Sequence, residues 1–235
     1  MQSIGKSLKS GYKICEPDFY ENNTRDLDRL MLQTNFGRPE KADRGSFLHN
    51  YHRPYSKIFY KDMRYKVENV LEIGIWVGLG LLTWSHWFPN AIIEGVDWKF
   101  QYQSKIKRLY DLKEQVNNVE RILLNWVDTS ERGMVLKHFN PIKYDDYFDI
   151  IIDDGNHFSS GQKATLINFW QYLKPGGWYC IEDITDRYEQ PTKIIEYLNE
   201  LSEEGHSVGW FENPESIRQD SRMVAIKKKG EVANV

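Results

Sequence analysis

The chain has 235 residues and a net charge of −3, which suits one α/β domain with a short N-terminal extension. Hydrophobic residues make up 40% and charged residues 28%, as in ordinary globular proteins, and the slightly acidic balance argues against nucleic acid as the main partner. Two cysteines exclude a disulfide framework or zinc site, and the lack of a signal peptide or long apolar run favours a cytoplasmic protein without membrane contact.

The first 62 residues predict a helical extension. Residues 1–23 are polar and irregular, and the spacing of apolar side chains favours helices over 24–34 and 47–61. A loop that contains glycine and proline separates the two helices. We expect this extension to form part of a lid over a cofactor and acceptor, in front of a domain that spans residues 63–235.

Strand and helix patterns alternate from residue 67 to the end of the domain. Strands are expected at 69–73, 91–96, 121–127, 148–153, 178–181, 206–211 and 222–227, and helices at 79–87, 101–114, 130–138, 159–173 and 191–203. Five β-α repeats followed by a terminal hairpin predict a doubly wound, seven-stranded and mostly parallel sheet of the Rossmann-like α/β class. The last strand is expected to insert antiparallel to its neighbours.

Acidic residues stand at the carboxyl ends of all five strands in the β-α repeats. They are Glu72, Asp97, Asp128, the pair Asp153 and Asp154, and the pair Glu182 and Asp183. Ligands of an open α/β sheet bind at these strand ends. Ordinary loop solvation accounts for one or two such acids but not for a set at every end, so we expect the functional site here.

A glycine-rich turn follows the first strand, in the stretch from Leu71 to Gly80, and the second strand ends on Asp97. Such a unit holds a nucleoside-bearing cofactor, because the glycines let the backbone approach the ligand and the acid binds the ribose hydroxyls. The spacing Gly74-x-x-x-Gly78-x-Gly80, with Glu72 inside the motif, favours S-adenosylmethionine (SAM) over NAD.

Individual cofactor contacts follow from this placement. Gly74 and Gly78 would leave room for the methionine part and the ribose, and Asp97 would accept hydrogen bonds from both ribose hydroxyls. Trp98 lies either against the adenine or in the core. Asp128 would accept from the adenine amino group, cap the helix expected from residue 130, or do both through its two oxygens.

A cation site is predicted where the fourth and fifth strands end, at Asp154, Glu182 and Asp183. Adjacent parallel strands lie about 4.8 Å apart, so these carboxylates should converge and repel one another unless something neutralises them. Oxygen ligands suit Mg²⁺ or Mn²⁺ better than zinc, whereas the alternative is a set of separate helix caps and loop acids. His157 would be a general base, because histidine exchanges a proton near neutral pH.

Four motifs together carry a family resemblance. They are Glu72-Ile-Gly-Ile-Trp-Val-Gly78, Ile152-Asp-Asp-Gly-Asn-His157, Leu173-Lys-Pro-Gly-Gly-Trp178 and Ile181-Glu-Asp183. They resemble class I SAM-dependent methyltransferases and, more narrowly, the metal-dependent macrocin-type sugar O-methyltransferases and the related cephalosporin-hydroxylase-like group. The resemblance covers residues 43–183, including an upstream segment that runs from Asp43 to Tyr55.

The resemblance implies SAM-dependent methylation of a sugar hydroxyl. In that family the three acids at the ends of the fourth and fifth strands would bind Mg²⁺, and Asp154 and His157 would be the catalytic pair, with the imidazole taking the proton from the hydroxyl. Ser46, His49 and Tyr51 would close over the methionine end of SAM. Asp153 is assigned to the cofactor side of the site.

The acceptor is expected to be a sugar or a glycan, with Arg187 and Tyr188 lining its cleft. Three alternatives remain: methylation of a phenol or catechol, an NAD-dependent oxidoreductase, and a non-catalytic glycan-binding module. The absence of G-x-G-x-x-G speaks against NAD, and the intact buried acids disfavour a retired site. The sequence does not predict the oligomeric state.

Overall fold

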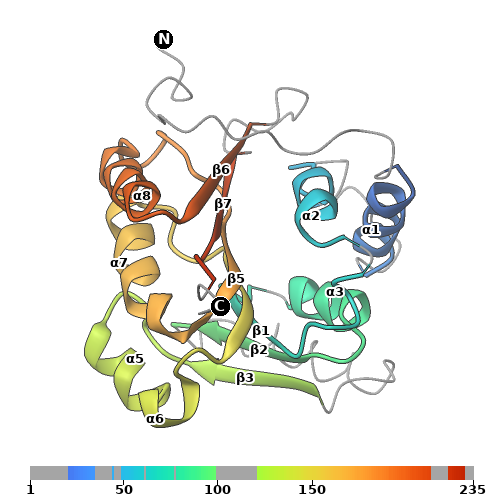
Figure 1. Cartoon of the computed structure of the whole chain (residues 1–235), viewed down its shortest axis with the longest axis horizontal. Coiled ribbons are helices and arrows are strands. Elements are labelled where there is room, and N and C mark those ends of the chain that lie inside the picture. The colour runs from blue at the N-terminus through green and yellow to red at the C-terminus, as the bar shows by residue number, and fades with distance from the viewer. Residues whose placement is uncertain are drawn as a thin grey trace, which may run out of the picture.

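The structure, a computed structural model, describes residues 21–34, 44, 49–60, 62–76, 78–98, 121–212 and 222–230. A seven-stranded sheet runs through the middle of the protein in the order β3-β2-β1-β4-β5-β7-β6, with helices on both faces (Figure 1). The strands are β1 Asn69–Ile73, β2 Ile92–Asp97, β3 Ile122–Trp126, β4 Phe148–Asp153, β5 Leu173–Ile181, β6 Ser207–Glu212 and β7 Arg222–Lys227.

The topology confirms the expected doubly wound sheet. Strands β1 to β5 pair in parallel, and β7 inserts antiparallel between β5 and β6. The strand order reverses between β1 and β4, whose neighbouring carboxyl ends therefore form the switch point at which ligands of such sheets bind. Strand β5 begins earlier than expected, at Leu173, and its pairing with β4 shifts register between Phe148 and Ile150.

The helices also follow the expected order. They are α1 Glu21–Thr34, α2 His52–Ile58, α3 Leu79–Trp87, α5 Arg132–His138, α6 Pro141–Tyr144, α7 Ser159–Phe169 and α8 Thr192–Glu203, with a 3₁₀ turn, η5, at Trp170–Tyr172. Helix α2 is shorter than expected, and the helix expected over 101–114 lies outside the described residues. The short α6 was not expected: Asn140 accepts from the backbone N–H of Ile142, and Pro141 occupies the first helical position.

Two apolar clusters lie on opposite faces of the sheet because successive strand residues point to opposite sides. Along β4, Ile150 and Ile152 join the cluster beneath α1, α2 and α3, whereas Ile151 joins the cluster beneath α7 and α8. Figure 1 shows these helix groups on either side of the sheet. Burial on both faces explains why the strand sequences are continuously apolar rather than alternating.

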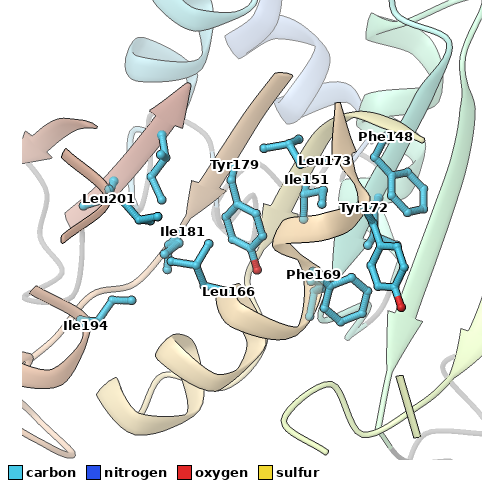
Figure 2. Close-up of a cluster of buried hydrophobic side chains, with 14 of the residues drawn as sticks. Phe148, Ile151, Leu166, Phe169, Tyr172, Leu173, Tyr179, Ile181, Ile194 and Leu201 are labelled. Atoms are coloured by element: carbon cyan, nitrogen blue, oxygen red, sulfur yellow. The ribbon is translucent and has the colours of Figure 1, made fainter. Parts of the chain in front are cut away.

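The α7–α8 face is filled by large side chains. Figure 2 shows Tyr179 of β5 between Ile181, Leu166 and the aromatic group that includes Phe169. Phe169 makes an edge contact with Phe139, with their ring centroids 5.2 Å apart. Burying one such side chain stabilises a fold by about 1.5–3 kcal/mol. This packing therefore holds β4 and β5 in place, and with them the residues at their carboxyl ends.

The described part of the N-terminal extension shares the core of the domain. Helix α1 packs against α2 and α3, and Leu27 and Tyr55 are completely buried in the first cluster. Tyr55 stacks on Phe59 and meets Trp84 of α3 edge-on. This packing places Tyr55 of the extension near the carboxyl edge of the sheet. No helix among the described residues has the length and apolarity to cross a bilayer.

Candidate active site

The turn after β1 passes directly against the end of β4. Gly74 has a φ of +89°, and a Cβ added there would lie 2.1 Å from the carbonyl oxygen of Asp154. The Asp154 N–H donates to the carbonyl of Ile73 at 2.8 Å. The close approach of β4 is therefore one reason why residue 74 must be glycine, in addition to the expected room for a cofactor.

Asp97, at the end of β2, fixes the same turn. Its Oδ2 accepts from the N–H groups of Ile75 at 3.0 Å and Trp76 at 3.3 Å, and its Oδ1 accepts from the Trp98 N–H at 2.8 Å. Two carboxylate oxygens offer about four acceptor sites, so about one site remains for a ribose hydroxyl, fewer than the two expected. Gly78, with a φ of +80°, completes the turn before α3.

The side chain of Trp98 is 62% exposed, which excludes the alternative that it packs in the core. Trp76, in the glycine turn, is 54% exposed. Both indoles therefore stand at the edge where a flat adenine ring would need a stacking surface.

Asp128 and Asp153 hold local contacts. Asp128 Oδ1 accepts from the N–H and the hydroxyl of Ser130, whereas the N-cap of α5 is Glu131. The expected helix cap at Asp128 is therefore wrong: the residue closes a turn just before the helix. Asp153 is buried, with Oδ2 accepting from the Tyr179 hydroxyl and Oδ1 from the Gly155 N–H, and burial raises its pKa to about 7.

A cation-type donor set forms where β4 and β5 end. One ligand atom each from Asp154, His157 and Asp183 lies within 4.8 Å of the others. Metal–ligand bonds of about 2.0–2.6 Å allow atoms so spaced to share one ion. Carboxylate oxygens suit Mn²⁺ or Mg²⁺, so Asp154 and Asp183 fit a divalent cation, with the imidazole of His157 beside it. Asp183 has a φ of +52°, a strained conformation for a residue other than glycine, and burial raises its pKa to about 6.

Glu182 is held differently from the other two predicted cation ligands. It is buried, and its Oε1 accepts a very short hydrogen bond from the Tyr55 hydroxyl and another from Arg44 Nε at 2.6 Å. The structure therefore brings Asp154 and Asp183 together with His157 and pairs Glu182 with Arg44. Glu182 as a cation ligand stays a prediction.

Arg44 is an unexpected centre of this edge. Its guanidinium contacts three carboxylates, with Nη1 at 2.8 Å from Glu72 Oε1, Nη2 at 2.8 Å from Asp154 Oδ2, and Nε bonded to Glu182. Burial alone would lower the pKa of Arg44, but these three acids raise it well above its ordinary value. Burial raises the pKa of Glu72 to about 7 despite the arginine. Arg44 therefore supplies positive charge at this edge.

The first turn of α3 makes space for this ion pair. A Cβ added at Gly80 would lie 1.9 Å from Glu72 Oε1 and 2.2 Å from Arg44 Nη1. The third glycine of the motif thus serves the arginine–glutamate contact. The sequence pattern identified this glycine but not the reason for it.

The upstream residues His49 and Tyr51 lie against Asp183. The Tyr51 hydroxyl donates to Asp183 Oδ1 at 2.5 Å and accepts from the Asp183 N–H at 3.0 Å. His49 Nδ1 is 3.3 Å from the same carboxylate oxygen, and its ring stacks on Tyr51. Their expected contact with the methionine end of SAM stays a prediction, and Ser46 lies outside the described residues.

Exposed aromatic rings flank the donor set. Tyr188 is 51% and Phe158 48% exposed, with ring centroids 5.6 Å apart, and Phe158 directly follows His157. The guanidinium carbon of Arg187 lies 5.4 Å from the centre of the Tyr188 ring. Glu189 accepts from the N–H and hydroxyl of Ser160, which ties the loop of Tyr188 to the first turn of α7.

Sequence reasoning missed Arg44, Tyr55 and Phe158 as site residues. A signal for Arg44 existed, since several carboxylates that converge need a positive partner, and a buried arginine provides one as well as a metal does. Its position in the chain, far upstream of the acids, gave no indication of the contact. Phe158 carried no signal beyond its place beside His157.

The comparisons with known proteins agree with this geometry. No family model matches the chain. It is 28% identical to the mycinamicin VI 2''-O-methyltransferase of Micromonospora griseorubida, over 80% of this chain and 44% of that protein. It is 26% identical to the demethylmacrocin O-methyltransferase of Streptomyces fradiae, over 57% of this chain and 32% of that protein. The chain thus spans less than half the length of these curated relatives.

Solved structures show the same fold. The MycE methyltransferase from the mycinamycin biosynthetic pathway, in complex with Mg, SAH and mycinamycin VI, superposes with a TM-score of 0.64 at 22% identity. That match covers 89% of this chain and 56% of the other. The expected resemblance is confirmed: this chain has the class I methyltransferase fold and is related over most of its length to the macrocin-type sugar O-methyltransferases.

Proposed function

We propose that the chain is a SAM-dependent, divalent-cation-dependent O-methyltransferase that acts on a sugar hydroxyl. One observation carries the proposal: the carbonyl of Asp154 lies so close to Gly74 that the cation-type donor set and the cofactor-type turn form one continuous site. An enzyme that transfers a methyl group to a cation-bound hydroxyl needs its cofactor site next to its cation site. Holding the two reactants in line supplies much of the rate gain.

The residues of the chain divide the work by position. Asp97 and the turn from Gly74 to Gly78 would hold SAM, and Asp154 and Asp183 would hold the cation. When bound, SAM supplies the methyl group and the cation lowers the pKa of the acceptor hydroxyl. His157 would accept the hydroxyl proton, and Asp183 Oδ2, 3.6 Å from its Nδ1, would stabilise the imidazolium that forms.

The aromatic pair Phe158 and Tyr188 would bind the acceptor. A sugar presents an apolar C–H face that packs on aromatic rings, and its hydroxyls accept hydrogen bonds from a guanidinium such as that of Arg187. Both features stand beside His157, where the reacting hydroxyl must arrive. Further relatives are O-methyltransferases named for an olivosyl and a rhamnosyl compound, which supports a glycosylated metabolite as the acceptor class.

A transfer assay with labelled SAM tests this function. The purified protein is offered glycosylated macrolides that lack a sugar O-methyl group, free nucleotide sugars, and catechol, each with and without EDTA. We expect label on a sugar acceptor, its loss with EDTA, and its recovery with excess Mg²⁺ or Mn²⁺. Label on catechol alone would contradict a sugar acceptor and favour a phenol. Full transfer in EDTA would contradict the cation role.

His157→Ala tests the proton acceptor within the same assay. Removing a general base typically lowers turnover by about 100-fold or more. SAM affinity should hold because His157 faces Asp183 of the cation half. His138→Ala is a matched control, since that histidine lies on α5 and bonds to Asn125 away from the site. Equal turnover of the two variants would refute the assignment of His157.

A further inference from the structure

One guanidinium ion holds two of the three acids expected to bind the cation. Arg44 bonds to Asp154 through Nη2 and to Glu182 through Nε, at 2.8 and 2.6 Å. The third acid, Asp183, is held instead by Tyr51 and His49. A cation that gathered all three carboxylates would therefore have to take two of them from Arg44.

Glu72 offers Arg44 an alternative partner. Its Oε1 already lies 2.8 Å from Arg44 Nη1, whereas its Oε2 is buried and accepts no hydrogen bond from a described residue. Burial raises the pKa of Glu72, and the indole of Trp84 is near enough to the carboxylate to lower that pKa in part. Glu72 is not part of the donor set formed by Asp154, His157 and Asp183. An arginine–carboxylate pair is most stable when both oxygens are engaged, so Arg44 could leave the cation ligands and bind Glu72 through both.

We propose that Arg44 and the divalent cation compete for Asp154 and Glu182, so that Arg44 is a positioning residue that holds the cation ligands until the cation binds. The inference rests on the cation site of the proposed function. It adds that cation binding moves the Arg44 side chain toward Glu72. The carboxylates of Asp154 and Glu182 thus have a positive partner in both states, which is Arg44 before the cation binds and the cation afterwards.

Cation affinity, measured by calorimetry with MnCl₂ in the absence of SAM and acceptor, tests the competition. The decisive variant is the double substitution R44Q/E72Q, compared with wild type at about pH 8, above the pKa of about 7 of Glu72. There Glu72 is ionised, so the variant loses one positive and one negative charge and the net charge of the edge is unchanged. A competing arginine predicts that this variant binds Mn²⁺ about tenfold more tightly, a factor equal to the loss of one charge-assisted hydrogen bond. A purely electrostatic role of Arg44 predicts no change.

Arg64→Gln is the matched control. Arg64 donates to the carbonyl of Trp87 and lies over its ring, and it forms no ion pair with a described residue. We expect its Mn²⁺ affinity to equal that of the wild-type chain. Arg44→Lys keeps the charge but cannot span three carboxylates, so it should bind Mn²⁺ more tightly than wild type and provides a second test if the double variant does not fold.

The outcomes separate this inference from the proposed function. Tighter Mn²⁺ binding by R44Q/E72Q or R44K, with R64Q unchanged, supports the competition. Wild-type Mn²⁺ binding with equal or weaker affinity in the variants overturns the competition and leaves the methyl-transfer proposal standing. Absence of Mn²⁺ binding by the wild-type chain and by both Arg44 variants overturns the competition and the cation role together, whereas SAM binding and labelled transfer are measured independently.

Discussion

The two halves of the carboxyl edge are built on different principles. On the β1–β2 half, Asp97 is held by backbone N–H groups of the adjoining turn and of its own successor. On the β4–β5 half, Glu182 and Asp183 are held by the side chains of Arg44, Tyr55 and Tyr51, which come from more than a hundred residues upstream. Asp97 and the glycine turn are thus locally determined, whereas the cation half depends on the N-terminal extension, which reaches the cofactor half through the contact of Arg44 with Glu72.

This contrast predicts separable functions. Changes on the β4–β5 half should affect turnover and cation dependence with little effect on SAM binding. Changes on the β1–β2 half should affect SAM binding first. The contrast between the two halves is therefore tested by substitutions that change either cation binding or SAM binding but not both.

Asp154→Ala should have the largest effect. It removes a predicted cation ligand, so we expect turnover to fall by about 1000-fold or more, the scale on which charge stabilisation at a reacting centre acts. Cation-induced stabilisation should disappear, and SAM affinity should change by less than about threefold, because both Asp154 backbone contacts with the turn remain. The transfer assay measures turnover and calorimetry measures SAM affinity. A large loss of SAM affinity would show that the two halves do not act separately.

Gly80→Ala tests the point at which the halves meet. The added methyl would collide with Glu72 and Arg44, so we expect a loss of about 1–3 kcal/mol in the free energy of unfolding. Gly133→Ala on α5 is the control, because a Cβ there meets no atom within 4 Å and should stabilise the helix by up to about 1 kcal/mol. Chemical denaturation compares them, and equal stability of the two variants would show that the arginine–glutamate contact is loose.

The success of sequence reasoning follows the same division. Strand β1 and strand β4 were predicted to the residue, since apolar runs bounded by glycine and acid define a buried strand. The glycine turn and Asp97 are contiguous or nearly so, and their placement followed from the pattern. Arg44 and Tyr55 could not be placed, because their contacts exist only after α2 packs on α3 and carries them to the edge. Sequence periodicity predicts faces of helices but not which distant acid each face meets.

Asp97→Asn should act on the cofactor half with a smaller effect. The amide keeps one acceptor oxygen but loses the charge and one set of acceptor sites, so we expect SAM affinity to fall by about tenfold, or 1.4 kcal/mol. Mn²⁺ affinity measured without SAM should not change, since the hydrogen bonds of the Asp97 carboxylate to described residues come from the turn and Trp98. A loss of Mn²⁺ affinity equal to the loss of SAM affinity would contradict the local character of this half.

Glu94→Gln, in the body of the sheet, should have the smallest effect and depends on pH. Burial raises the pKa of Glu94, so the folded state binds its proton more tightly than the unfolded state, and stability falls as the pH rises from the ordinary carboxyl range through that raised value. Glutamine cannot ionise. The variant should therefore match the wild type at acidic pH and exceed it at neutral pH by on the order of 1 kcal/mol. Unfolding curves at several pH values check this; parallel curves for both proteins would refute it.

A thermal-shift titration with SAM, its product S-adenosylhomocysteine and NAD, each with and without Mg²⁺, tests the central claim most directly. A ligand at 100 times its Kd adds about 2.7 kcal/mol to the folded state, which corresponds to about 5–10 °C for a chain of this size. We predict a saturable rise with SAM and with its product, and none with NAD. No rise with SAM at any Mg²⁺ concentration, or a saturable rise with NAD, would contradict it.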